Sequence, residues 1–193
     1  MDQFIFYAKL GLFHVLDIHA YDHILFLVVM TVPYVFKDWK RILTLVSIFT
    51  VGHTLSLILS VYGVVRINAN LVEFLIPITI LISALYNLFT AGKISKGERV
   101  GVLFFAALFF GLIHGLGFAS HFKAIVGSGG KLLPLLEYAV GIEGAQLIIV
   151  LVVLILSFLI QTVFRFSKRD WVLVTSSMVI GIVILMLRDH WLW

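Results

Sequence analysis

The segment LDIHAYDHILFLVVM, residues 16–30, changes abruptly from charged and polar residues to a continuous apolar run. Asp17, His19, Asp22 and His23 precede that run. A helix that crosses a bilayer needs about 20 mostly apolar residues, so the run predicts the beginning of a membrane span. The ionisable residues at its border need a separate explanation, which depends on where the chain places its other polar groups.

The composition indicates an integral membrane protein. Of the 193 residues, 62% are hydrophobic and 12% are charged, whereas a soluble domain is about half apolar and about a quarter charged. The lipid bilayer is therefore an expected partner. The chain has no cysteine, which excludes disulfides and thiolate metal sites. It has no P-loop, no dinucleotide-binding fingerprint and no soluble domain, so nucleic acid is not an expected partner.

Six apolar runs are long enough for membrane helices, and they are continuous rather than alternating, which favours helices over barrel strands. We therefore expect an all-α fold: a polytopic membrane helix bundle with six transmembrane helices, forming a single domain over residues 1–193. Residues 1–18 are apolar but short and contain Lys9, so we expect a short N-terminal interfacial helix there. The expected spans are 21–36, 41–64, 71–91, 99–120, 134–164 and 171–188.

The basic residues are distributed unequally between the two sides of this topology. Of the 14 lysines and arginines, nine lie in the loops after the first, third and fifth spans. The positive-inside rule makes that side cytoplasmic. We therefore expect a multi-pass protein of the bacterial inner membrane with both termini outside. The nine residues are Lys37, Lys40, Arg41, Lys93, Lys96, Arg99, Arg165, Lys168 and Arg169.

Polar residues from separate segments fall at one depth, in the outer half of the membrane. His53 follows Arg41 by twelve residues and His114 follows Arg99 by fifteen, at about 1.5 Å of rise per residue. Ionisable groups inside spans face cavities or one another, because burying them in lipid is unfavourable. The shared depth predicts one site. The groups that contribute to this layer are His19, Asp22, His23, His53, Glu73, His114, His121, Glu143 and Gln146.

The spacing of these residues supports a common site. His19, Asp22 and His23 are related as i, i+3 and i+4 and share one helix face. Glycines flank His53, His114 and Glu143, and small residues let membrane helices approach closely. Imidazole and carboxylate ligands without thiolates suit nickel, cobalt, zinc or Fe(II). The expected metal ligands are His19, Asp22, His23, His53, His114 and Glu143, with Asp17, Glu73, His121 and Gln146 as outer-shell or pathway groups.

Each of these residues also has a simpler explanation. Asp17 and Asp22 could cap a helix start, His53 could be a hydrogen-bonding strut, and Glu73 could be solvated at a span end. His190 fits an aromatic belt at the membrane interface and is left out of the site. The shared depth of the polar groups is the reason for preferring a ligand set.

Five blocks of the chain resemble, in order, the HupE/UreJ family of small nickel permeases. They are GLFHVLDIHAYDHILFLV, FTVGHTLSL, LVEFLIPITI, FGLIHGLGFA and YAVGIEGAQ. The resemblance implies functional roles for His14 in the first block and for Asn87 after the third. Ala139 and Ala145 depart from the Asn and Gly of many relatives. The resemblance implies uptake of nickel, or of cobalt, for hydrogenase or urease maturation.

We therefore expect a permease for a divalent transition metal, most consistent with nickel, and not an enzyme. An intramembrane zinc-dependent hydrolase that uses the same cluster is the alternative, and a b-type haem protein with His53 and His114 as axial ligands is a third. A homo-oligomer and metalloenzyme maturation proteins stay open as partners. Because the cytoplasmic half has no ionisable residue within its spans, we expect an apolar floor below the site.

Overall fold

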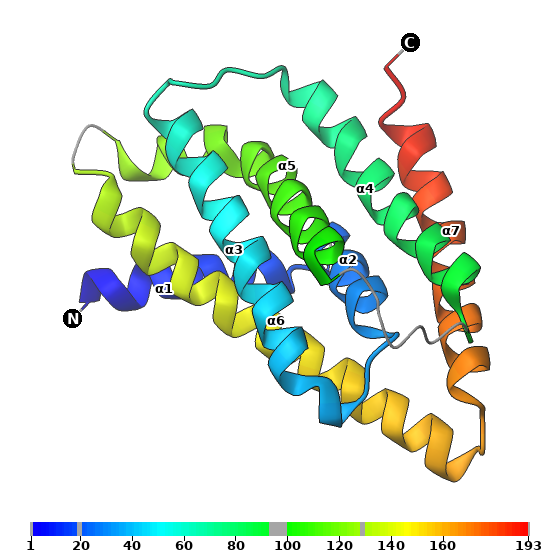
Figure 1. Cartoon of the computed structure of the whole chain (residues 1–193). Coiled ribbons are helices and arrows are strands. Elements are labelled where there is room, and N and C mark those ends of the chain that lie inside the picture. Colours follow the sequence, from blue (N-terminus) through cyan, green and yellow to red (C-terminus); the bar gives the residue numbers. More distant parts are fainter. Residues whose placement is uncertain (1, 19–20, 93–99, 128–129, 193) are drawn as a thin grey trace.

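The computed structural model describes residues 2–18, 21–92, 100–127 and 130–192, and every regular element in those ranges is helical (Figure 1). The expected all-α fold is confirmed. The elements are α1 (Asp2–Leu16), α2 (Asp22–Thr31), the 3-10 helix η1 (Phe36–Asp38), α3 (Trp39–Val61), α4 (Ala69–Thr90), α5 (Val100–Val126), α6 (Leu132–Val163) and α7 (Lys168–Asp189).

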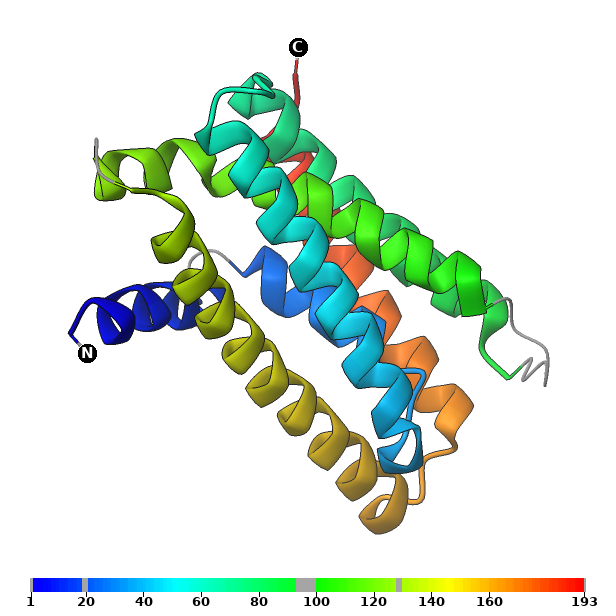
Figure 2. The ribbon, with the colours of Figure 1, turned by 60° about the vertical axis from the view of Figure 1, so that its left-hand side comes forward.

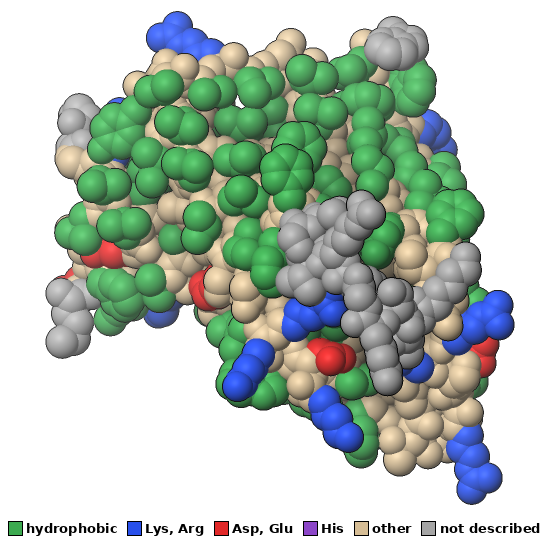
Figure 3. Space-filling view, in the orientation of Figure 1, with side chains coloured by type: hydrophobic (Ala, Val, Ile, Leu, Met, Phe, Trp, Pro, Cys, Tyr) green, Lys and Arg blue, Asp and Glu red, His purple; other side chains and the backbone are tan. Residues whose placement is uncertain are grey.

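Five helices, α3 to α7, are long and apolar enough to cross a membrane. Their outer faces carry large hydrophobic side chains that remain exposed, including Phe105, Phe158 and Met178, and green apolar side chains cover much of the visible surface (Figure 3). A water-soluble protein does not expose so large a continuous apolar surface. The chain is therefore a multi-pass membrane protein.

The first expected span, 21–36, is not confirmed, because the helix in that region is too short. The ten residues of α2 extend about 15 Å at 1.5 Å per residue, half of a hydrocarbon layer of roughly 30 Å. Pro33 ends the helix, since it has no N–H to donate to the carbonyl of Val29. The Asn87 side chain satisfies that carbonyl instead, with its Nδ2 donating to Val29 O at 2.7 Å. Five long spans, and not six, are present in the described chain.

The helix expected at the membrane interface, α1, packs closely along α6. A Cβ at Gly11 would lie 2.1 Å from the carbonyl oxygen of Tyr138, and one at Gly141 would lie 1.9 Å from that of Ala8. The two backbones are therefore in direct contact, which only glycine permits. This crossing holds the C-terminal end of α1 inside the bundle, so a purely interfacial helix over 1–18 is not confirmed.

A second glycine crossing joins α3 to α5. A Cβ at Gly52 would lie 2.4 Å from Leu108 O, and one at Gly115 would lie 2.1 Å from His53 O. Close approach at these positions confirms the predicted role of the glycines near His53 and His114. Gly144 is different, because nothing lies within 4 Å of a Cβ built there.

The helix α2 lies among the long helices, where it contacts α4, α6 and α7 (Figure 2). The loops before α3 and before α7 meet at one end of the bundle, because Arg41, Lys168 and Arg169 line the same cavity. Glu73 and His190 meet elsewhere, between the start of α4 and the end of α7, with Oε2 and Nδ1 3.6 Å apart. Two of the three basic loops thus lie at one end of the bundle, whereas Lys93, Lys96 and Arg99 of the third lie outside the described residues, and the orientation in the membrane stays a prediction.

Candidate metal centre

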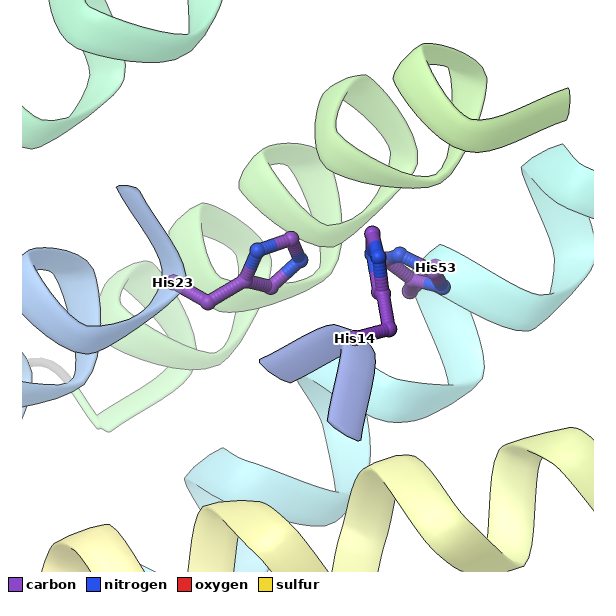
Figure 4. Close-up of side chains that lie close together, drawn as sticks. All are labelled: His14, His23 and His53. Atoms are coloured by element: carbon purple, nitrogen blue, oxygen red, sulfur yellow. The ribbon is translucent and has the colours of Figure 1, made fainter. Parts of the chain in front are cut away.

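Three histidines from three helices converge inside the bundle. His14 of α1, His23 of α2 and His53 of α3 each offer one ring nitrogen, and these atoms lie within 4.8 Å of one another. Figure 4 shows the three imidazole rings directed toward a common space. Their ring centroids are 4.8 Å (His14–His23), 5.8 Å (His23–His53) and 6.1 Å (His14–His53) apart. We call this group the histidine trio.

Four of the six ring nitrogens of the trio are buried and have no hydrogen-bond partner among the described residues. His53 is 0% exposed, and both of its ring nitrogens are without a partner among the described residues, as are Nε2 of His14 and Nε2 of His23. Buried polar atoms are almost always paired in proteins. Three adjacent imidazoles with unused nitrogens therefore indicate a site that binds something the polypeptide does not provide.

Asp22 fixes the ring of His23. The carboxylate oxygen Oδ1 accepts hydrogen bonds from the ring Nδ1 at 3.0 Å and from the backbone N–H of His23 at 2.9 Å. Because Nδ1 carries the proton that is donated, Nε2 keeps the lone pair that a metal requires. A carboxylate behind a histidine ligand is the usual arrangement in metal sites. Asp22 therefore contacts the trio through His23, and its predicted role as a direct ligand stays a prediction.

The protonation of His14 also suits metal binding. Burial, together with the neighbouring imidazole of His23, lowers the pKa of His14 to about 3. The ring is therefore neutral near pH 7, and a neutral imidazole is the form that binds metals.

His114 lies beside the trio on α5. Its ring centroid is 5.3 Å from that of His23. Its Nδ1 donates to Phe110 O at 2.9 Å, which leaves the lone pair on a buried Nε2 that has no partner among the described residues. His114 thus offers a fourth imidazole next to His23, although it is not one of the three whose nitrogens converge.

The sequence of this chain matches the model of one known protein family. Residues 1–190 match the family described as HupE / UreJ protein. The chain belongs to the HupE/UreJ family. Searches among curated proteins and among solved structures gave no match. A multi-pass helical fold and a buried cluster of histidines are thus properties of a HupE/UreJ protein.

Glu143 lies in a different polar group of this HupE/UreJ protein. Ser47 Oγ donates to Glu143 Oε1 at 2.6 Å, and the Thr50 hydroxyl donates to Oε2. Thr50 Oγ1 also lies 2.8 Å from Gln146 Oε1. These four residues, which we call the Glu143 group, join α3 to α6. Glu143 is not brought into the trio, and its predicted role as a ligand stays a prediction.

The remaining predicted residues lie outside the trio. Asp17 is exposed directly after α1, and His121 is exposed on α5 next to Phe118, with ring centroids 5.4 Å apart. Glu73 lies beside His190. His19 falls outside the described residues, so its predicted role as a ligand is not addressed. Asn87 of α4 is buried, and its side chain donates a hydrogen bond to the Val29 carbonyl near the end of α2.

The structure gives His14 a more central position than its spacing indicates. His14 and His23 are nine residues apart, which does not place two side chains on one face of a continuous helix. They meet because the chain breaks between α1 and α2. Only the resemblance of the first block to the HupE/UreJ family pointed to His14.

Proposed function

We propose that this HupE/UreJ protein is a permease for a divalent transition-metal ion, with nickel as the substrate. The observation that carries the proposal is the convergence of three buried imidazole nitrogens within 4.8 Å. Neutral nitrogen ligands without thiolates suit nickel, cobalt and zinc better than Cu(I), magnesium or calcium. The ion would pass through the trio as cargo.

The electrostatics of the trio favour a passing ion over a permanently held one. The dication would leave water for a site in which the carboxylate of Asp22 is hydrogen-bonded to one ring of the trio. Burying a charge without full compensation is unfavourable. Three imidazoles leave coordination positions open, and conduction requires binding that is weak enough for the ion to leave.

The proposed topology follows the positive-inside rule. The end of the bundle with Arg41, Lys168 and Arg169 would face the cytoplasm, the membrane would be the bacterial inner membrane, and both termini would lie outside. The metal would serve maturation of a metalloenzyme, and the protein would not itself be an enzyme.

The first test is a titration of the purified protein with nickel, beside metal analysis by elemental mass spectrometry. We expect exchangeable nickel binding that is weakened in His14→Ala and His53→Ala and unchanged in His121→Ala, which removes an exposed histidine from the same chain. Reconstituted liposomes should accumulate nickel with the wild type and His121→Ala only. Equal binding and uptake by all four proteins would contradict the proposal.

The three-histidine arrangement also favours a second candidate, an intramembrane zinc hydrolase. Catalytic zinc sites use three protein ligands and keep one position for water. Zinc that stays bound at one ion per chain through dialysis, together with cleavage of a lipid or peptide substrate, would favour the hydrolase. Rapid exchange of zinc for nickel would favour the permease.

A further inference from the structure

A cavity of about 620 Å³ opens toward the basic end of the bundle. Its walls come from α2, α4, α5 and the beginnings of α3 and α7. Arg41, Lys168 and Arg169 line its outer part, whereas Phe26 and Phe110 line its inner part. We call this cavity the inner chamber.

A single layer of aromatic rings separates the inner chamber from the histidines. Phe26 stacks on Phe49 with ring centroids 4.7 Å apart and meets Phe110 edge to face at 5.9 Å. The ring of His114 lies 5.3 Å from Phe26 and 5.2 Å from Phe49. Phe26 therefore contacts His114 and also lines the chamber. These rings form the expected apolar floor below the site.

The wall of the chamber carries a stripe of oxygen atoms along α4. Ser83, Asn87 and Thr90 are related as i, i+4 and i+7, so they share a face, and all three line the chamber. The hydroxyl of Ser83 donates to Thr79 O and that of Thr90 to Tyr86 O.

Asn87 Nδ2 likewise donates to a backbone carbonyl, that of Val29. What the three side chains still offer is oxygen lone pairs, which suit a cation or its hydration water.

We propose that the inner chamber is the second half of the ion's path, and that Phe26 is the barrier between it and the histidines. This inference rests on the proposed transport function. The ion crosses when the Phe26 ring leaves Phe49 and swings into the adjacent space of the chamber. Three cationic side chains, Arg41, Lys168 and Arg169, and one carboxylate, that of Asp38, line the chamber, so its net positive charge does not hold a dication and the chamber is a passage and not a second binding site.

The chain has no cysteine, so a single introduced cysteine reports access to the chamber. Ser83→Cys places a thiol on its wall with little change in size. Inverted and right-side-out membrane vesicles are treated with a membrane-impermeant thiol reagent. We expect labelling of Ser83→Cys from the face that carries the basic loops and none from the opposite face.

A thiol on the far side of Phe26 tests the barrier. The ring of His114 lies 5.3 Å from that of Phe26, so His114→Cys should stay unlabelled from the face that carries the basic loops. Adding Phe26→Ala should permit its labelling from that face, and Phe110→Ala should do the same if loss of the buried Phe26 ring impairs folding. The matched control is Phe109→Ala, which removes an exposed ring of α5 and should leave the His114→Cys thiol unlabelled.

Two results would overturn the proposal: labelling of Ser83→Cys from both faces while Phe26 is intact, or labelling of His114→Cys that neither Phe26→Ala nor Phe110→Ala changes in correctly folded protein. The assay contains no metal, so its outcome is separate from that of the nickel titration. If the wild type does not bind nickel but the cysteines are labelled as expected, the proposed substrate is refuted and the proposed path is still supported.

Discussion

Two polar clusters inside this membrane protein differ in how far their hydrogen-bonding capacity is used, although Nε2 of Gln146 in the Glu143 group is also without a partner among the described residues. In the Glu143 group, hydroxyls of α3 donate to the carboxylate of α6. In the histidine trio, ring nitrogens from three helices face one another without partners among the described residues. Polar groups in lipid are expensive unless they are satisfied. The first cluster therefore links two helices by hydrogen bonds, and the second has nitrogen atoms available for a ligand.

The difference shows how a structural polar cluster can be told from a binding site in a membrane bundle. Depth in the membrane does not separate the two clusters, because the sequence places both Glu143 and His53 in the outer half of the bilayer. The partners of each side chain do separate them. Changes to the trio should therefore alter metal affinity, and changes to the Glu143 group should alter stability.

The largest effect on affinity is expected for His23→Ala. His23 belongs to the trio and also contacts His114, so its loss removes a direct ligand. Nickel affinity should fall by more than the roughly 10–100-fold typical of outer-shell changes, as measured by isothermal titration. His190→Ala, at an exposed position in contact with Glu73, is the control and should bind nickel like the wild type. If His23→Ala binds nickel as tightly as the wild type, the histidine trio and the Glu143 group do not differ as binding site and structural cluster.

Asp22→Asn should give the next largest effect. The carboxylate holds Nδ1 of His23 at 3.0 Å, so the amide weakens the orientation and basicity of the ring without removing a ligand. We expect nickel affinity to fall about 10–100-fold. The same titration measures it, and an affinity equal to that of the wild type would show that Asp22 merely begins the helix.

Gly115→Ala tests the crossing that positions His53. The added methyl would lie 2.1 Å from the His53 carbonyl oxygen, so the helices must separate. Overpacking of this kind costs about 1–3 kcal/mol, which thermal unfolding in detergent would detect as a lower midpoint. Gly144→Ala is the matched control, since nothing lies within 4 Å of its Cβ. Equal midpoints for the two variants would contradict the close crossing.

The smallest effect on metal binding is expected for Glu143→Gln. The amide keeps the shape of the side chain but weakens the hydrogen bonds from Ser47 and Thr50. Unfolding stability should fall by about 1 kcal/mol, while the nickel affinity stays within the error of the titration. A loss of affinity as large as that of His23→Ala would make Glu143 a ligand, as the sequence suggested, and would overturn the comparison.

The sequence was informative where long apolar runs and local spacing decide the structure. The five spans of α3 to α7 follow from hydropathy, and the glycines beside His53 and His114 indicated the close crossing. The short α2 was not foreseen, because the apolar run continues past Thr31. Pro33 was the local signal for its end. The Val29 carbonyl, which Pro33 leaves without a helical donor, accepts a hydrogen bond from Asn87, 58 residues away. No local sequence pattern predicts this bond.

The position of Glu143 could not be predicted for a similar reason. Hydropathy gives the depth of a residue along a continuous apolar helix such as α6, but not the rotation of the helix about its axis. That rotation depends on packing. The crossing of Gly11 with the Tyr138 carbonyl oxygen fixes how α6 meets α1, and Glu143 then faces Ser47 and Thr50 of α3.

X-ray absorption spectroscopy at the nickel edge tests the central claim most directly. Purified protein loaded with one equivalent of nickel should show imidazole scattering that fits the three ligands His14, His23 and His53. The scattering should fall by one imidazole in His14→Ala if nickel remains bound, and should be unchanged in His121→Ala. A nickel environment of oxygen ligands alone, identical in wild type and His14→Ala, would contradict the assignment of the trio as the metal centre.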